Sequence, residues 1–302
     1  MIRSLRLGVM EQKYSLSGSF LVNLVIVRPS VTQIAIKKVN ALAISEADDM
    51  LAAEEPLEIR LEYGAEDART QKSISVTMRT PGNDFELATG FLYTEGIIHK
   101  AGDIAGIKHC NGENENVVKV MLSTAVKPDM AKLDRHFYTT SSCGVCGKSS
   151  IEAVRTSCNI APTEDSLQIA SETVYRLPDI LRKHQEVFES TGGLHASALF
   201  DLEGTLLLTR EDVGRHNALD KLIGAALKDE ILPLDKHMLL LSGRASFELI
   251  QKATMAGIKI VAAVGAPSSL AAQMAEEKGM TLIGFLRGER FNIYSGAQRI
   301  VI

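Results

Sequence analysis

The chain has 302 residues, of which 45% are hydrophobic and 23% are charged, and its formal net charge is −4. This length allows a packed core and suggests one or two domains. The small acidic excess argues against a general nucleic-acid-binding protein, which would carry a basic excess. Any anionic ligand must therefore be bound by locally placed arginines and lysines.

The first 45 residues are predicted to form a strand-rich extension. The apolar stretch 20–27 contains Asn23 and is far shorter than the ~20 residues that a membrane-spanning helix needs. It also lacks the small-residue cleavage site of a signal peptide, so we expect a strand there and another over 33–39. With no membrane segment and no export signal, the expected compartment is the cytoplasm, where thiols stay reduced. The sequence assigns no role to residues 1–45.

Residues 46–135 are predicted to form an N-terminal α/β subdomain. A helix is expected directly after Asn83, because Glu86 follows this N-cap residue at the spacing of a capping box. Alternation of polar and apolar residues, or a short apolar run after a turn, predicts strands over 58–63, 73–78 and 117–122.

Residues 136–148 contain the cysteine pair Cys143 and Cys146 in the segment Ser-Cys-Gly-Val-Cys-Gly. The segment lacks periodicity and interleaves glycines with the cysteines, so we predict an exposed, mobile loop. A thiol becomes nucleophilic as a thiolate, which a nearby cation, a helix N-terminus or the Cys-x-x-Cys spacing favours. Lys148 and a helix predicted from Ser149 onward supply the first two conditions.

Four interpretations of the cysteine pair remain open from the residues alone. The two thiols could be structural. A zinc site would need two more ligands, and Cys110 and Cys158 have no local partner cysteine. A thioredoxin-type pair should follow an apolar strand, whereas residues 138–142 are polar. A persulfide carrier needs an exposed, soft nucleophile, and the composition favours this fourth interpretation only slightly.

Residues 149–302 are predicted to form a C-terminal α/β subdomain that binds a cofactor. Its strands are near-continuous apolar runs, as expected when helices cover both faces of a parallel sheet. The fold class is therefore α/β with an open sheet. The predicted strands are 195–200, 205–208, 238–241, 258–264 and 281–286, and the predicted helices are 218–227, 247–256 and 269–278.

Ligands of such sheets lie beyond the carboxyl ends of the strands. Here those ends are 242–244, 265–268 and 287–290, which contain arginines and a helix start suited to phosphate groups. Arg215 and His216 stand in the first turn of a helix, where cations are poorly placed for the helix dipole, so they too point to a ligand.

Plain structural roles compete with these assignments. Residues 287–290 could be an ordinary polar turn, and His195 could be a core histidine with satisfied hydrogen bonds. Glu211 and Asp212 could simply cap the helix that begins near Gly214.

Six blocks of the sequence, in order, resemble those of one known family. They are 79–91, 141–147, 191–196, 211–221, 242–244 and 285–290, within a match that spans roughly residues 52–299. Together they resemble the FdhD family, the formate dehydrogenase accessory sulfurtransferases. Residues 1–45 lie outside this resemblance.

The resemblance implies a cytoplasmic sulfurtransferase that carries sulfur from an L-cysteine desulfurase to the molybdenum or tungsten cofactor of formate dehydrogenase. It also implies a fold like that of cytidine deaminases and a homodimer. Cys143 is then the expected persulfide carrier and Cys146 an assisting or resolving thiol. The bound acceptor would be the bis(molybdopterin guanine dinucleotide) cofactor, which guanine nucleotides are expected to mimic, with no structural metal.

The cofactor would contact the strand-end loops and the central blocks. Gly288 would let the backbone approach the ligand, and Glu289 could accept hydrogen bonds from guanine. The full set of predicted cofactor-binding residues is His195, Arg215, His216, Ser242, Gly243, Arg244, Phe285, Leu286, Arg287, Gly288, Glu289 and Arg290.

Other functions remain as alternatives. The protein could bind the cofactor as a chaperone without handling sulfur, or it could be a thiol-disulfide oxidoreductase. A zinc deaminase would need a His-x-Glu motif followed by Pro-Cys-x-x-Cys. His195 lacks that Glu two residues later, and the cysteine pair follows Ser142 and precedes the histidine.

Overall fold

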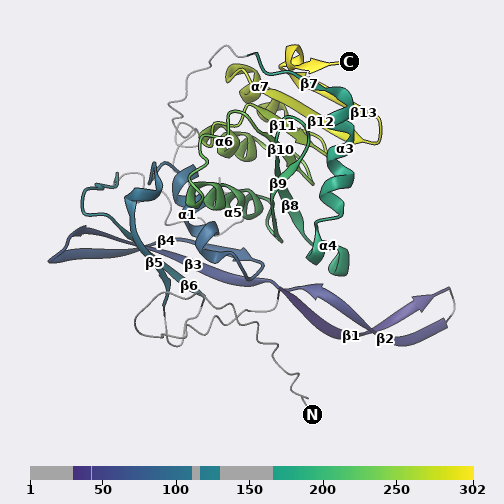
Figure 1. The fold of residues 1–302 in the computed structure, drawn as a ribbon. Helices are drawn as coiled ribbons and strands as arrows, with labels where there is room; N and C mark the ends of the chain where they lie inside the picture. The colour runs from purple at the N-terminus through teal and green to yellow at the C-terminus, as the bar shows by residue number, and fades with distance from the viewer. Residues whose placement is uncertain (1–29, 42, 111–115, 130–165) are drawn as a thin grey trace, which may run out of the picture.

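The computed structural model describes residues 30–41, 43–110, 116–129 and 166–302 (Figure 1). Several predictions lie outside the described residues. They are the strand over 20–27, the loop over 136–148 with Cys143 and Cys146, and the helix from Ser149.

A six-stranded mixed sheet forms the centre of the C-terminal half (Figure 1). Its central strands β10, β11 and β12 are parallel, and each outer strand is antiparallel to its neighbour. In sheet order the strands are β13 (Arg290–Ser295), β12 (Thr281–Arg287), β11 (Ile260–Ala263), β10 (Met238–Leu241), β8 (His195–Phe200) and β9 (Leu206–Asp212). The predicted open α/β sheet is confirmed. Its edge strand β13 was not predicted.

Helices cover both faces of this sheet, as predicted. The side chains of Leu239 and Leu241 pack with α5 (Arg215–Lys228), α6 (Phe247–Met255) and α7 (Ser269–Glu277). On the opposite face, Met238 and Leu240 pack with α3 (Ser171–Arg182), which was not predicted. Pro178 lies inside α3, and an internal proline normally indicates a helix break. The likeness of this sheet to that of cytidine deaminases stays a prediction.

A four-stranded sheet with its own apolar core forms the N-terminal half. In sheet order its strands are β4 (Ala68–Arg79), β3 (Glu55–Ala65), β6 (Val117–Leu122) and β5 (Ile104–His109). The strands predicted over 58–63, 73–78 and 117–122 are confirmed. Strand β5 was missed because it is short, largely exposed and interrupted by Gly106.

Helix α1 (Asp84–Thr94) begins where the sequence predicts, but the predicted capping box is wrong. Asn83 has a left-handed backbone (φ 56°), and its side chain makes no capping hydrogen bond. Glu86 instead binds the guanidinium of Arg210 on β9. The side chain of Glu86 therefore forms a tertiary ion pair and does not take part in a capping box.

Helices α1 and α5 cross at two glycines and thereby join the two halves. A β-carbon added to Gly90 would lie 1.8 Å from the carbonyl oxygen of Asp220. One added to Gly224 would lie 1.9 Å from the carbonyl oxygen of Glu86. The helix backbones touch at this crossing, so no larger residue fits at either position.

A long hairpin projects from the two sheets (Figure 1). It consists of β1 (Val31–Asn40) and β2 (Ala43–Ala52), and the strand predicted over 33–39 lies within β1. The boundary predicted at residue 45 falls inside β2, and the other predicted boundaries lie outside the described residues.

Two smaller features complete the fold. Strands β7 (Ile169–Ala170) and β14 (Ile300–Val301) form a short parallel pair. Within the described part of the chain, no helix combines the length and apolar character needed to cross a membrane.

Candidate functional site

The loops at the carboxyl ends of β10, β11 and β12 are joined by backbone hydrogen bonds. The N–H of Gly265 donates to the carbonyl of Gly243 over 2.9 Å, and the N–H of Phe285 donates to the carbonyl of Gly265 over 3.1 Å. The loops 242–244 and 265–268 and the end of β12 therefore form one continuous edge, as predicted for the carboxyl ends of parallel strands.

His195 lies at the same edge because β8 runs antiparallel to β10. The hydroxyl oxygen of Ser242 accepts from the N–H of Ala196 over 2.8 Å, and the N–H of Ser242 donates to the carbonyl of Ala196 over 3.0 Å. A β-carbon at Gly243 would lie 3.2 Å from Nδ1 of His195. The glycine therefore leaves room for the imidazole beside the backbone.

Arg215 and Arg244 place positive charge close to His195, and His216 also acts on it. Burial lowers the pKa of His195 first, and the charges of Arg215, His216 and Arg244 lower it further, while Asp212 opposes the shift. His195 is therefore neutral at physiological pH. We call these four residues the cationic cluster, and all four were predicted site residues.

His216 is held by the start of α6. Its Nε2 lies 3.3 Å from the hydroxyl of Ser246 and 3.9 Å from a carboxylate oxygen of Glu248. Burial would raise the pKa of Glu248, but hydrogen bonds with His216 and Ser246 outweigh it and lower that pKa to about 2. Sequence reasoning missed Ser246 and Glu248 because this contact joins two helix starts 30 residues apart.

The arginines of the cluster retain donors for a ligand. Nε of Arg215 is buried and has no hydrogen-bond partner among the described residues. Arg244 is exposed, and its stem packs close to Gly265. Buried donors are nearly always satisfied, so an unpaired guanidinium nitrogen at a sheet edge indicates a place for an anion.

The predicted segment 285–290 has two different parts. Leu286 is fully buried in the core, so only its main chain could meet a ligand. The turn from Arg287 to Arg290 is exposed and links β12 to β13, with Gly288 in the left-handed region (φ 52°). This turn includes Glu289 and lies at the tip of a hairpin. The turn is connected to the cationic cluster only through the main chain, since the N–H of Phe285 donates to the carbonyl of Gly265. Phe285 itself has a left-handed backbone, with φ 54°.

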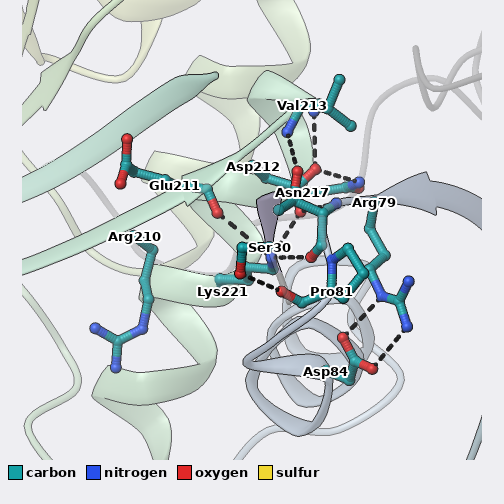
Figure 2. A network of polar contacts seen from close by, with 12 residues as sticks. Ser30, Arg79, Pro81, Asp84, Arg210, Glu211, Asp212, Val213, Asn217 and Lys221 are labelled. Atoms are coloured by element: carbon teal, nitrogen blue, oxygen red, sulfur yellow. Dashed lines mark hydrogen bonds and ion pairs between the residues drawn. The ribbon is translucent and has the colours of Figure 1, made fainter. Parts of the chain in front are cut away.

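Residues of two sequence blocks form a buried polar joint between β4 and α5 (Figure 2). Nζ of Lys221 lies 2.7 Å from a carboxylate oxygen of Asp212 and donates to the carbonyl of Thr80 over 2.9 Å. Asp212 also accepts from the N–H of Thr80, and Arg79 pairs with Asp84. These side chains therefore position the start of α5 and do not face a ligand.

Glu211 and Asp212 have separate partners. Glu211 accepts from the N–H groups of Val187 and Phe188, so it caps α4 (Glu186–Thr191) and not α5. Asp212 accepts from the N–H of Gly214, the N-cap residue of α5. The local capping role considered from the sequence is thus wrong for Glu211.

A metal site and a cavity are the two remaining features to consider beside the cationic cluster. Among the described residues, no group of three His, Cys, Asp or Glu side chains is arranged to hold a metal ion. A cavity of about 800 Å³ lies between the start of α1, β5 and the end of α5. It shares no residue with the cationic cluster, which lies at the start of α5.

Sequence comparison identifies close relatives. The chain matches the FdhD/NarQ family over residues 52–301. It is 53% identical over 258 residues to the sulfur carrier protein FdhD of Mycolicibacterium paratuberculosis, which covers 83% of this chain and 92% of that protein. It is 51% identical over 268 residues to the protein of the same name from Streptomyces coelicolor, covering 86% of this chain and 92% of that protein.

A solved structure shares the fold. The crystal structure of a candidate formate dehydrogenase accessory protein from Desulfotalea psychrophila matches 90% of this chain and 100% of its own, with a TM-score of 0.71 and 24% identity. At that identity the likeness concerns the fold alone. Because the family match covers most of the sequence and two relatives exceed 50% identity, the chain belongs to the FdhD/NarQ family.

Proposed function

We propose that this protein is a sulfur carrier for formate dehydrogenase. It accepts persulfide sulfur from an L-cysteine desulfurase in the cytoplasm and delivers it to the molybdenum or tungsten bis(guanine dinucleotide) cofactor. The relatives that are 53% and 51% identical carry the name sulfur carrier protein FdhD. The family match also includes Cys143 and Cys146, the thiols suited to this chemistry.

Sulfur acceptance requires one nucleophilic substitution. The thiolate of Cys143 attacks the outer sulfur of the desulfurase persulfide, forming a new S–S bond. The S–S bond to the desulfurase breaks, and the desulfurase cysteine leaves as a thiolate. One sulfur atom is transferred without any external oxidant or reductant.

Sulfur release as hydrosulfide requires two electrons. The thiolate of Cys146 can supply them by attacking the inner sulfur of the Cys143 persulfide. A Cys143–Cys146 disulfide forms, hydrosulfide leaves toward the cofactor, and a cellular thiol reductant resets the pair. In this series of steps Cys146 releases the sulfur, which Cys143 cannot do alone.

The cationic cluster is the observation that best supports a polyanionic acceptor. Two arginines and His216 surround the neutral His195 at the carboxyl edge of the sheet, and Nε of Arg215 is buried without a hydrogen-bond partner among the described residues. Arginine forks bind phosphate groups through paired, charge-assisted hydrogen bonds. A nucleotide cofactor with several phosphates suits such a cluster better than a small neutral substrate does.

The first prediction concerns sulfur loading. After incubation with a desulfurase and L-cysteine, intact-protein mass spectrometry should show the addition of one sulfur atom, located at Cys143 by peptide mapping. The Cys143→Ala variant should lose the adduct, whereas Cys146→Ala should retain it and fail to release sulfide. Cys110→Ala is the matched control, since Cys110 is a free cysteine that directly follows β5 and lies outside the Cys-x-x-Cys segment. An adduct of equal yield in Cys143→Ala would contradict the assignment.

The second prediction concerns the cationic cluster. GDP, which carries the guanine and diphosphate of the cofactor, should bind the Arg244→Ala variant roughly 10- to 100-fold more weakly than wild type in calorimetric titrations. The reason is that a charged hydrogen bond contributes about 1.5–3 kcal/mol and about 1.4 kcal/mol corresponds to tenfold. Arg182→Ala, at the exposed end of α3, should bind GDP normally. Equal affinities in the two variants would place the nucleotide elsewhere.

Two further assays, formate dehydrogenase maturation and insulin reduction, separate the alternatives. A chaperone that binds the cofactor without handling sulfur would bind GDP normally yet support formate dehydrogenase maturation with both cysteines replaced by alanine. A thiol-disulfide oxidoreductase would instead catalyse the reduction of insulin disulfides. Neither result is expected.

A further inference from the structure

A cavity of about 800 Å³ beside the end of α5 lies apart from the cationic cluster. Its walls come from the start of α1, from β5 and from the last residues of α5. Helix α5 has 14 residues and is therefore about 20 Å long, which places the cavity and the cluster at opposite ends of one helix. Binding pockets for small molecules commonly enclose ~300–1,000 Å³ within mostly apolar walls that carry a few polar groups. The cavity therefore has the size of a second ligand site.

Most of the cavity wall is apolar, and part of it is aromatic. Ile104 and Ile107 of β5 and Leu227 of α5 line it and pack in the N-terminal core. Phe85, in the first turn of α1, is 38% exposed. Its ring lies beside the imidazole of His109, with the ring centroids 4.8 Å apart and 33° between the planes. Aromatic rings pack well against other flat rings, so these walls suit a molecule with a flat apolar body.

The cavity wall carries one positive charge that no described residue neutralises. The carboxylates of Asp84 and Glu86 also line the cavity, but each forms a paired ionic contact with an arginine. Arg79 donates to Asp84 over 2.8 Å and 2.9 Å, and Arg210 donates to both carboxylate oxygens of Glu86. Lys228, the last residue of α5, is exposed and makes no hydrogen bond or ion pair with a described residue. The wall therefore favours a ligand with one anionic group.

The backbone at the start of α1 leaves a further polar group available beside the cavity. Asn83 is the N-cap residue of α1, and such a side chain normally accepts a hydrogen bond from the first turn of its helix. Asn83 instead has a left-handed backbone (φ 56°), and its exposed side chain has no hydrogen-bond partner among the described residues. A left-handed residue other than glycine is uncommon, and strained backbone of this kind concentrates at ligand sites. The amide of Asn83 can therefore bind a polar group of a ligand in the cavity.

We infer that this cavity binds a small organic anion with a flat apolar body, such as an aromatic carboxylate or sulfonate. The rings of the ligand pack against Phe85, His109 and the isoleucines of β5, and its anionic group pairs with Lys228. The amide of Asn83 supplies a hydrogen bond at the mouth. A nucleotide with several phosphates suits the cavity poorly, because one lysine does not balance several negative charges. The cavity is therefore a second site, with a ligand different in kind from that of the cationic cluster.

Two fluorescent probes test the inference on the full-length protein. Anilinonaphthalene sulfonate has a flat aromatic body and one negative charge, whereas N-phenylnaphthylamine has the same body without the charge. Titration should show saturable binding of the sulfonate to wild type. Phe85→Ala should bind both probes roughly three- to tenfold more weakly, because the aromatic contact is lost. Lys228→Met should bind the sulfonate roughly two- to fivefold more weakly and the neutral probe as wild type does, because only the charge contact is lost.

Each variant has a matched control elsewhere on the surface. Tyr294→Ala removes an aromatic ring from β13 whose exposure, 38%, equals that of Phe85. Lys183→Met removes an exposed lysine that likewise stands at the end of a helix, α3. Both controls should bind the two probes as wild type does. Far-UV circular dichroism and thermal melting establish that each variant is folded, since partly unfolded protein also binds the sulfonate.

Three outcomes would overturn the inference. The first is a wild type that shows no saturable binding of the sulfonate. The second is a Phe85→Ala variant that binds the probes as tightly as Tyr294→Ala does. The third is a Lys228→Met variant that matches Lys183→Met, or that loses both probes equally, since the site would then have no preference for an anion. The measurement involves neither the cysteine pair nor GDP, so its failure is distinct from failure of the proposed sulfur transfer.

Discussion

The Lys221→Met variant is expected to be about 3–5 kcal/mol less stable than wild type, because it leaves a buried carboxylate without its cation. The side chains of Lys221 and Asp212 are 2% and 0% exposed, and their charged atoms lie 2.7 Å apart. Asp212 also accepts hydrogen bonds from the N–H groups of Thr80 and Gly214, so it stays in place when the lysine is removed. Urea denaturation at pH 7 measures the loss.

The matched control is Lys119→Met, which removes the lysine of an ion pair between β6 and β3. Nζ of Lys119 lies 3.0 Å from Glu62, but these side chains are 20% and 19% exposed, so the expected loss is only about 0–1 kcal/mol. Equal losses in the two variants would mean that water reaches Lys221 and that the joint is not buried.

The buried joint also links stability to the site. Asp212 ends β9, and α5 then begins with Arg215 and His216 of the cationic cluster. The side-chain amide of Asn217 donates to the carbonyl of Met78 on β4 and to Asp212. Folded Lys221→Met protein is therefore expected to bind GDP more weakly than the Lys119→Met control, although Lys221 itself does not face the cluster.

Sequence patterns predicted those elements whose form depends on burial alone. The apolar run 238–241 corresponds to β10 residue for residue, since all four side chains are buried. The strand order then brings loops 242–244 and 265–268 together, because parallel strands end at one edge. The prediction succeeded where one physical rule, apolar burial between two helical layers, determined the result.

The missed elements and contacts depend on tertiary structure. Helix α3 tolerates Pro178 because packing against the sheet outweighs the lost hydrogen bond. The side chain of Glu86 meets Arg210 from 124 residues away, and no local pattern reports such a partner. The anchoring of His216 by Glu248 is of the same kind. The residues of the cationic cluster could therefore be predicted from the sequence. The side chains that position them, such as Glu248 beside His216, could not.

Replacing Gly90 or Gly224 with alanine is expected to destabilise the protein by about 2–3 kcal/mol, as overpacking does in a tight core. Helix propensity alone predicts the opposite, since alanine is favoured over glycine in a helix by roughly 0.5–1 kcal/mol. The added β-carbon would lie 1.8 Å or 1.9 Å from a carbonyl oxygen, far inside van der Waals contact. That oxygen belongs to the facing helix, so relief requires α1 and α5 to separate.

Gly102→Ala is the control for this crossing, because a β-carbon at Gly102 would meet nothing within 4 Å. Thermal melting should show Gly102→Ala near wild type and both crossing variants clearly lowered. The crossing variants should also lose GDP affinity, since α5 carries Arg215 and His216 at its start and would tilt when its middle is displaced from α1. Wild-type stability in Gly90→Ala would show that the helix backbones do not touch at this crossing.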